Sequence, residues 1–275
     1  MELNWLECLV YGLISGLAEF LPISSVAHQT VFLKLLGAEN VSCLQASAHI
    51  GAFAALLIGC LPLLKRLRRE WRLHAMPKKR RRRHPDLPTL MEMRVFRTGA
   101  AMVILAFLTY GLVHDLHDRL WVLAIILGIN GILLYVPQYL PGANKGAQSL
   151  SRLDAVLIGL AGGAGVVPGI SAVGSAVSVA RIRGADRKYA VDLALLLCIP
   201  GLILLIAAEL VASVTGGLAV TGLTVLYCFT AAAASFLSGS WGIVLLRFLA
   251  VKAGYSGFAY YCWGMALFSL ILYLI

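Results

Sequence analysis

The stretch that decides the fold is Leu13-Ile14-Ser15-Gly16-Leu17-Ala18-Glu19-Phe20-Leu21-Pro22, followed directly by Ile23-Ser24-Ser25-Val26-Ala27-His28. An acid, a proline, two hydroxyls and an imidazole fall inside this one apolar segment. Translocon-type scales assign an acid at the bilayer centre a cost of about 2.5–3.5 kcal/mol, so such a residue usually has a function. The stretch therefore predicts a helix that is broken inside a membrane, with a polar site at the break.

The whole chain has the composition of a membrane protein. It has 275 residues, of which 60% are hydrophobic, and a mean hydropathy of +0.86. We expect an all-α integral membrane protein with one membrane domain over 1–275 and no removable signal peptide. Six single cysteines without metal spacing are expected to be buried free thiols. Apolar runs predict membrane spans at 47–64, 95–115, 120–138, 188–213, 218–240 and 254–275.

Two further apolar regions are interrupted in the middle, at Pro22 in 5–36 and at Pro168-Gly169 in 153–182. Each half is too short to cross a bilayer of about 30 Å at 1.5 Å per residue. Both regions share a Gly-rich run before a Pro and a Ser after it, and three spans follow each one. This predicts an inverted-topology repeat, in which each half is a re-entrant helix-loop-helix plus three transmembrane helices. Repeat 1 covers about 1–138 and repeat 2 about 153–275.

The positive charge is concentrated along the chain. A basic loop at about 65–94 carries most of the 13 Lys and Arg residues that lie between Lys65 and Arg97. A nucleic-acid patch is one interpretation of this loop, but beside a membrane span the positive-inside rule favours a cytoplasmic location. If the first broken region enters from outside, 21 of the 23 Lys and Arg residues lie inside, and only Lys34 and Arg119 lie outside. The two broken regions then enter from opposite faces and meet near the midplane.

Polar side chains gather at both expected tips. The helices after Pro22 and Pro168 would direct the positive ends of their dipoles to a shared centre, which favours an anion such as phosphate. A divalent cation, Mg²⁺ or Ca²⁺, bound to Glu19 would bridge acid and phosphate. We predict three catalytic residues and four substrate-binding residues: Glu19 (also the metal ligand), Ser25 and His28; and Ser24, Ser171, Gly174 and Ser175.

Structural roles are the alternatives for most of these residues. Ser24 or Ser25 is a natural helix cap, and His28 a plausible interior histidine. The Gly-rich second region also suits close helix packing. His49 either reaches the cavity from the outer side or sits in the membrane interface, and the interface is favoured. Asp192 and Glu209 are interpreted as boundary residues, and His114, Asp115, His117 and Asp118 as a solvated loop.

The segment from Gly16 to His28 resembles the first signature of the bacitracin-resistance family of undecaprenyl-diphosphate phosphatases, and Pro168-Gly169-Ile170-Ser171 with Gly174 resembles its second. The order of spans and the length agree as well. The resemblance implies a membrane enzyme that removes the terminal phosphate of undecaprenyl diphosphate, recycles the carrier lipid for cell-wall synthesis and confers bacitracin resistance. It also implies a divalent cation and an outward-facing site. Glu19 matches the family's acid, Ser25 and His28 its nucleophile and proton-transfer group, and Ser171 its phosphate contact.

The sequence departs from the family's pattern at two places. Ser15 stands where the family has a second acid or Gln, and Ala172 stands where it has an Arg. His49 stands where an amide is frequent. The alternative function is therefore a non-hydrolytic polyprenyl-phosphate transporter or lipid-binding homologue. In both cases we expect a multi-pass protein of the bacterial inner membrane. We expect a polyprenyl (di)phosphate as its ligand and no nucleic acid as a partner. A homodimer is one assembly that the sequence allows.

Overall fold

The structure is a computed structural model that describes residues 3–38, 41–77, 79, 91–113, 116, 119–140, 144–216, 221–252 and 255–275. The side chains of residues 91, 251 and 252 are outside this description. So are the loop residues His114, Asp115, His117 and Asp118, and residues 78 and 80–90 of the basic loop.

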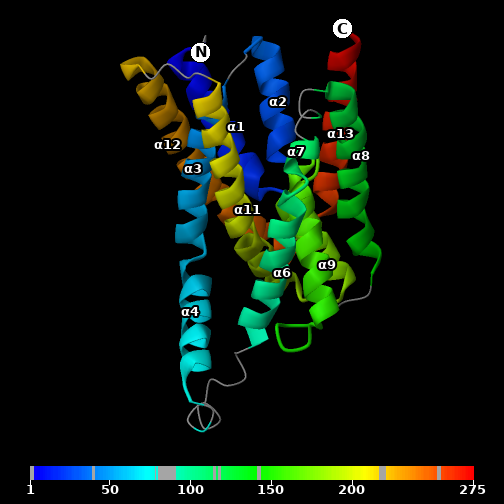
Figure 1. Ribbon diagram of the computed structural model, residues 1–275. Helices are drawn as coiled ribbons and strands as arrows, with labels where there is room; N and C mark the ends of the chain where they lie inside the picture. Colours follow the sequence, from blue (N-terminus) through cyan, green and yellow to red (C-terminus); the bar gives the residue numbers. More distant parts are fainter. Residues whose placement is uncertain are drawn as a thin grey trace.

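The described chain is helical, which confirms the all-α prediction (Figure 1). Its one β-type pairing is an isolated bridge between Lys145 and Ala185. In chain order the elements are α1 (Trp5–Phe20), α2 (Ser25–Leu36), α3 (Ser42–Gly59), α4 (Leu61–Ala75), α6 (Met91–Phe107), α7 (Tyr110–Val113), α8 (Leu120–Tyr135), η3 (Val136–Tyr139), α9 (Arg152–Gly163), η4 (Ala164–Val166), α10 (Ala172–Ile182), α11 (Arg187–Thr215), α12 (Gly222–Lys252) and α13 (Ser256–Leu274).

Five helical segments in the described chain are long and apolar enough to cross a membrane: 42–59, 120–139, 187–215, 222–250 and 256–274. The protein is therefore a multi-pass membrane protein. The expected continuous span 95–115 was wrong, because α6 ends at Phe107 and α7 begins only at Tyr110. The Thr109 hydroxyl donates to the Ala106 carbonyl oxygen at 2.7 Å, and the backbone N–H of Thr109 bonds to the same carbonyl. Such local bonds compete with the α-helical ladder and end α6.

Four short helices form two pairs, each interrupted by a break in the chain. Asn4 and Glu7 form a capping box that starts α1, and the chain breaks at Pro22 before Ser24 caps α2. Ser151 and Asp154 start α9 in the same way, and Ser171 caps α10. With 11 to 16 residues each, these helices extend about 16–24 Å at 1.5 Å per residue, less than the hydrocarbon thickness of about 30 Å.

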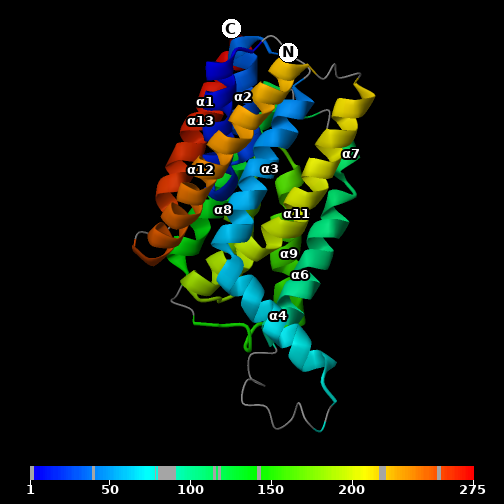
Figure 2. The same cartoon turned by 90° about the vertical axis from the view of Figure 1, so that its left-hand side faces the viewer.

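The ends of the molecule differ. Both chain termini and the end of α2 lie at one end, which we call the terminal end, and α4 projects from the other, which we call the basic end (Figure 1). α12 packs against both α1 and α3, as the turned view in Figure 2 shows. The helices approach so closely that they leave no room for side chains at two glycines. A Cβ at Gly16 would collide with the Ser235 carbonyl, and one at Gly51 with the Ala232 carbonyl. These contacts hold the helix that carries Glu19 against the bundle.

Candidate active site

The breaks in the two helix pairs touch each other at the centre of the bundle. The Ser171 hydroxyl donates to the Leu21 carbonyl oxygen at 3.3 Å. A Cβ added to Gly174 would lie 2.8 Å from the Pro22 Cβ, so the glycine permits this approach. Segments 150 residues apart in sequence therefore form one structural unit.

Asn130 of α8 joins the two breaks, and sequence reasoning missed it. Its side-chain Oδ1 accepts the Ser171 N–H at 3.0 Å, while its Nδ2 lies 3.5 Å from the Pro22 carbonyl oxygen. The residue is fully buried. A buried amide usually has its polar groups satisfied. A lone Asn inside the apolar span 120–138 was therefore the signal in the sequence that could have indicated this contact.

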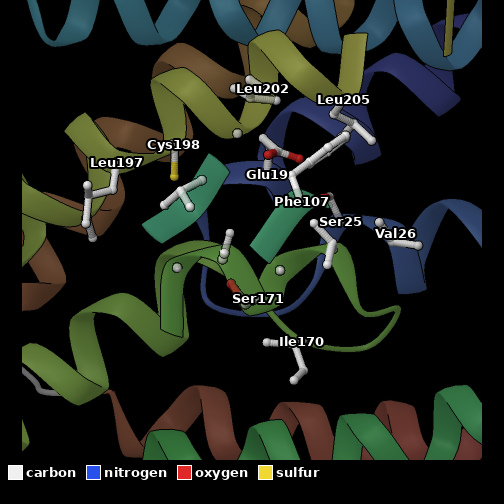
Figure 3. Close-up of a pocket in the computed structure, with 18 of the residues that line it drawn as sticks. Glu19, Ser25, Val26, Phe107, Ile170, Ser171, Leu197, Cys198, Leu202 and Leu205 are labelled. Atoms are coloured by element: carbon white, nitrogen blue, oxygen red, sulfur yellow. The ribbon is translucent and has the colours of Figure 1, made fainter. Parts of the chain in front are cut away.

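A cavity of about 60 Å³ opens beside this junction. One water needs about 10–15 Å³ of such volume, so the cavity has room for several waters or one phosphate group. Figure 3 shows Glu19 and Ser25 at the cavity, with Ser171 from the second break and Leu202 and Leu205 of α11 around it. Gly162, Gly163 and Gly165 line it as well, and Val103 and Phe107 of α6 complete an apolar wall. A polar end and an apolar wall suit an amphipathic ligand.

The backbone at the first break is strained. Ser24 is the one described non-glycine residue with positive φ, at 67°. Its hydroxyl accepts the Ala27 N–H at 3.4 Å and caps α2. Such conformations cost of order 1–3 kcal/mol and cluster at functional sites. The turn directs the start of α2, with Ser25 as its first residue, toward the cavity.

Glu19 is the single carboxylate among the described residues that line the cavity. Its side chain is 8% exposed, and its Oε2 has no hydrogen-bond partner within the described part of the protein. A buried bare carboxylate oxygen is costly unless a cation or proton satisfies it. Described His, Cys, Asp and Glu residues form no group of three or more that could hold a metal. A cation here therefore relies on Glu19 with hydroxyl, water and phosphate oxygens, a donor set that Mg²⁺ accepts.

His49 and Glu209 lie behind Glu19, and both sequence interpretations of these residues were wrong. His49 is 1% exposed, so it does not sit in the interface; its Nδ1 lies 2.8 Å from Glu209 Oε2 and its Nε2 3.8 Å from Glu19 Oε2. Glu209 is buried as well and is no boundary residue. Hydropathy could not reveal this pair, since its members lie 160 residues apart. Asp192, by contrast, pairs with Arg247 at 3.3 Å near the basic end.

His28 is not among the residues that line the cavity. Its Nδ1 donates to the Ser24 carbonyl oxygen at 2.8 Å, and its Nε2 lies 2.7 Å from the Tyr261 hydroxyl of α13. The two rings also stack, with centroids 5.5 Å apart. A carbonyl oxygen only accepts, so Nδ1 carries a proton and Nε2 of the neutral ring accepts from Tyr261. Its role in proton transfer stays a prediction.

The remaining predicted residues divide between the cavity and its support. Ser171 lines the cavity, and its hydroxyl also accepts the Gly174 N–H at 3.1 Å. Ser175 turns away from the cavity and donates to the Ala161 carbonyl oxygen at 2.6 Å. Ser24, Gly174 and Ser175 therefore shape the two breaks and do not line the cavity. Their predicted contact with substrate stays a prediction.

Positive charge is absent from the described lining of the cavity. Ala172 occupies the cavity wall at the start of α10. Arg183 bonds to Asp154 Oδ1 at 2.6 Å, and Arg181 to the Ala185 carbonyl oxygen at 2.6 Å, both at the far end of α10. As expected from their position two to three turns on, these arginines do not reach the break.

The fold and site define a multi-pass helical membrane protein whose central cavity offers a carboxylate, hydroxyls and two helix N-termini. The chain belongs to the bacitracin resistance protein BacA family, which matches residues 8–268. It is similar to the undecaprenyl-diphosphatase of a Nocardioides species, at 33% identity over 73% of this chain and 72% of the relative. Those of Carboxydothermus hydrogenoformans (29%, 98% of both chains) and Halothermothrix orenii (30%, 95% of both chains) are similar over nearly their whole length.

Proposed function

We propose that the protein removes the terminal phosphate of undecaprenyl diphosphate and so returns the carrier lipid to cell-wall synthesis. One observation carries the proposal: Glu19 and Ser25 meet two helix starts at one cavity with an apolar wall. Family membership and the names of the relatives support the same reaction. They do not favour the non-hydrolytic transporter or lipid-binding alternative.

In the proposed site each part of the cavity has its own task. The helix starts at Ser25 and Ala172 direct N–H groups and positive dipole ends toward the phosphate. Glu19 holds the divalent cation, Mg²⁺ or Ca²⁺, which supplies Lewis-acid stabilisation of the phosphate charge when bound. Leu202 and Leu205 exclude water on the side of α11. The polyprenyl chain would follow this apolar wall toward the lipid.

Ser25 is the proposed nucleophile. Its hydroxyl oxygen bonds to the terminal phosphorus while the bridging P–O bond to undecaprenyl phosphate breaks, and water then releases phosphate from the serine. His28, one turn further along α2, is the proposed proton carrier. Its present bonds to Ser24 and Tyr261 require a side-chain rotation before it reaches Ser25.

The proposed orientation places the basic end in the cytoplasm and the terminal end outside, in the bacterial inner membrane. The Lys and Arg residues of α4 support it. In this arrangement α1 and α2 form a re-entrant pair from outside, and α9 and α10 one from inside. Repeats of about 1–138 and 153–275 would then be inverted copies within a single membrane domain, and the cavity would open outward. A homodimer stays a prediction.

The test is phosphate release from undecaprenyl diphosphate by the purified protein, with and without Mg²⁺ or Ca²⁺. We expect turnover in the wild type, and a loss of at least about 10²-fold in Glu19→Gln and Ser25→Ala. Glu7→Gln, on the same helix as Glu19 but half-buried at its start, is the control. Absent turnover, together with movement of labelled polyprenyl phosphate across vesicles, would favour the transporter.

A further inference from the structure

The residues behind Glu19 form a buried row from Glu209 through His49 to Glu19. The His49 imidazole lies between two carboxylates, at 2.8 Å from Glu209 and 3.8 Å from Glu19. Neither His49 nor Glu209 lines the cavity. The ring therefore lies behind Glu19, outside the lining of the cavity.

Glu209 fixes the ring of His49. A carboxylate accepts hydrogen bonds only, so Nδ1 donates to Glu209 Oε2 and Nε2 faces the space shared by Glu19 and the Gln29 amide. Each of these residues lies on a different helix, namely α1, α2, α3 and α11. The imidazole is thus held by polar contacts with Glu209 and Gln29 on two neighbouring helices.

We propose that His49, anchored by Glu209, is a positioning residue that orients the Glu19 carboxylate for a divalent cation. The inference rests on the proposed function, because it assumes that Glu19 binds this cation. It explains why a histidine occupies a fully buried place and why a second buried acid lies beside it. Outer-shell partners that orient a ligating carboxylate typically change metal affinity or activity by about 10–100-fold when removed.

The experiment is a thermal-unfolding titration of the detergent-solubilised protein with Mg²⁺, which needs no turnover. The wild type should gain stability with Mg²⁺, and Glu19→Gln should lose this gain. His49→Ala should raise the half-maximal Mg²⁺ concentration about 10–100-fold. His49→Gln keeps a polar side chain beside Glu19 and should recover most of the affinity. His74→Ala, in the helix at the basic end, is the matched control.

Glu209→Gln keeps the shape of the anchor and supports the test if His49→Ala does not fold. It should weaken Mg²⁺ binding less than His49→Ala, with little change in KM for the lipid. Equal Mg²⁺ affinity in wild type, His49→Ala and Glu209→Gln would overturn the inference, and so would a wild type that ignores Mg²⁺. Phosphate release is measured separately. Its absence beside a His49-dependent Mg²⁺ response would reject the proposed reaction but not the role of His49.

A second, independent observation concerns two thiols at the terminal end. Cys43, near the start of α3, and Cys228, near the start of α12, have Sγ atoms 3.3 Å apart although 185 residues separate them. Both are half-buried and line an open groove of about 290 Å³ together with Val225 and Phe229. A disulfide bond is about 2.05 Å long, so a small approach brings the sulfurs to bonding distance.

We infer that Cys43 and Cys228 form a disulfide when the terminal end faces an oxidising compartment. Each thiol loses its hydrogen, the S–S bond forms, and two electrons and two protons pass to a disulfide oxidant, which leaves as two thiols. The groove gives a small oxidant access to both sulfurs. The bond would join α3, which carries His49, to α12, which packs against the helix of Glu19.

The test counts maleimide-reactive thiols in the denatured protein after treatment of membranes with oxidised glutathione. Of the six cysteines, the wild type should lose two thiols and regain them on reduction. Cys43→Ser and Cys228→Ser should each lose none. Peptide mass spectrometry should join the segments around positions 43 and 228. Six reactive thiols in the oxidised wild type, or a bond that joins other cysteines such as Cys8, would overturn the inference.

Discussion

The two helix breaks each place the start of a short helix at the cavity, but they present different side chains. The first carries the cavity's carboxylate, Glu19, and the strained turn at Ser24 that presents Ser25. The second presents mainly backbone: three lining glycines, Ala172 and the capping hydroxyl of Ser171. In the proposed function the first break therefore supplies the reactive groups, and the second supplies a shaped surface and a helix start.

The departures at Ser15 and Ala172 fit this division. Ser15 is buried, and its hydroxyl has no partner within the described residues. Ala172 forms part of the cavity wall. Compared with the family signatures, the first break lacks the acid or Gln and the second lacks the Arg.

The largest effect is expected at the first break. Glu19→Gln removes the one lining carboxylate and should lower kcat by about 10²–10³-fold, because electrostatic stabilisation of the phosphate depends on it. Ser171→Ala at the second break should cost far less. Steady-state phosphate release measures both. An equal loss in the two variants would contradict the division of roles.

The junction itself should be the next most sensitive place. Asn130→Leu leaves the Ser171 N–H without its acceptor and should destabilise the protein by about 1–3 kcal/mol. We also expect a clear drop in turnover, since both breaks lose their common support. Thermal unfolding and phosphate release test this together. Unchanged stability would show that the two breaks are held by packing alone.

How far the sequence predicted this arrangement depends on the distance between interacting residues. The break at Pro22, the acid at Glu19 and the caps have local signals, so they were predictable. The direction in which a helix faces was harder to predict: no local pattern indicated that Ser175 would donate to the Ala161 carbonyl of α9. The His49–Glu209 pair joins two helices that no local pattern relates. Only the fold could show that two isolated polar residues satisfy each other.

Steric contact between the breaks allows a finer test. Gly174→Ala adds a methyl group 2.8 Å from the Pro22 Cβ and should destabilise by about 1–3 kcal/mol through overpacking. The matched control is Gly264→Ala in α13, where an added Cβ meets no neighbour within 4 Å; it should be neutral or slightly stabilising. Comparable unfolding temperatures for Gly174→Ala and Gly264→Ala would mean that the close contact between the breaks does not contribute to the stability of the protein.

A positive charge added at the second break should increase the affinity of the site for the lipid diphosphate. Ala172→Arg places a guanidinium in the cavity wall at the second break. A charge-assisted bond to phosphate contributes about 1.5–3 kcal/mol, so KM for the lipid diphosphate should fall by about 10-fold. Ala172→Leu controls for bulk. A higher KM in Ala172→Arg than in Ala172→Leu would mean that the second break no longer faces the phosphate.

The smallest effect on turnover is expected away from both breaks, in α4 at the basic end. Glu70 is buried there, and its Oε2 accepts the Met93 N–H of α6 at 2.7 Å. Burial raises the pKa of Glu70 from 4.5 to about 7. Its stabilising contribution is thus full below pH 4.5 and is lost as pH rises through about 7.

Protection of the α4 backbone against hydrogen exchange should therefore fall between pH 5 and pH 8 in the wild type, after correction for the intrinsic exchange rate. Glu70→Gln cannot ionise and should flatten this dependence, while phosphate release stays within about 2-fold because the residue lies in neither break. A Glu70→Gln variant with the wild-type pH slope would assign the change to another group. A large loss of turnover in Glu70→Gln would instead show that α4 influences the reaction at the cavity. That result would contradict the confinement of the chemistry to the first break.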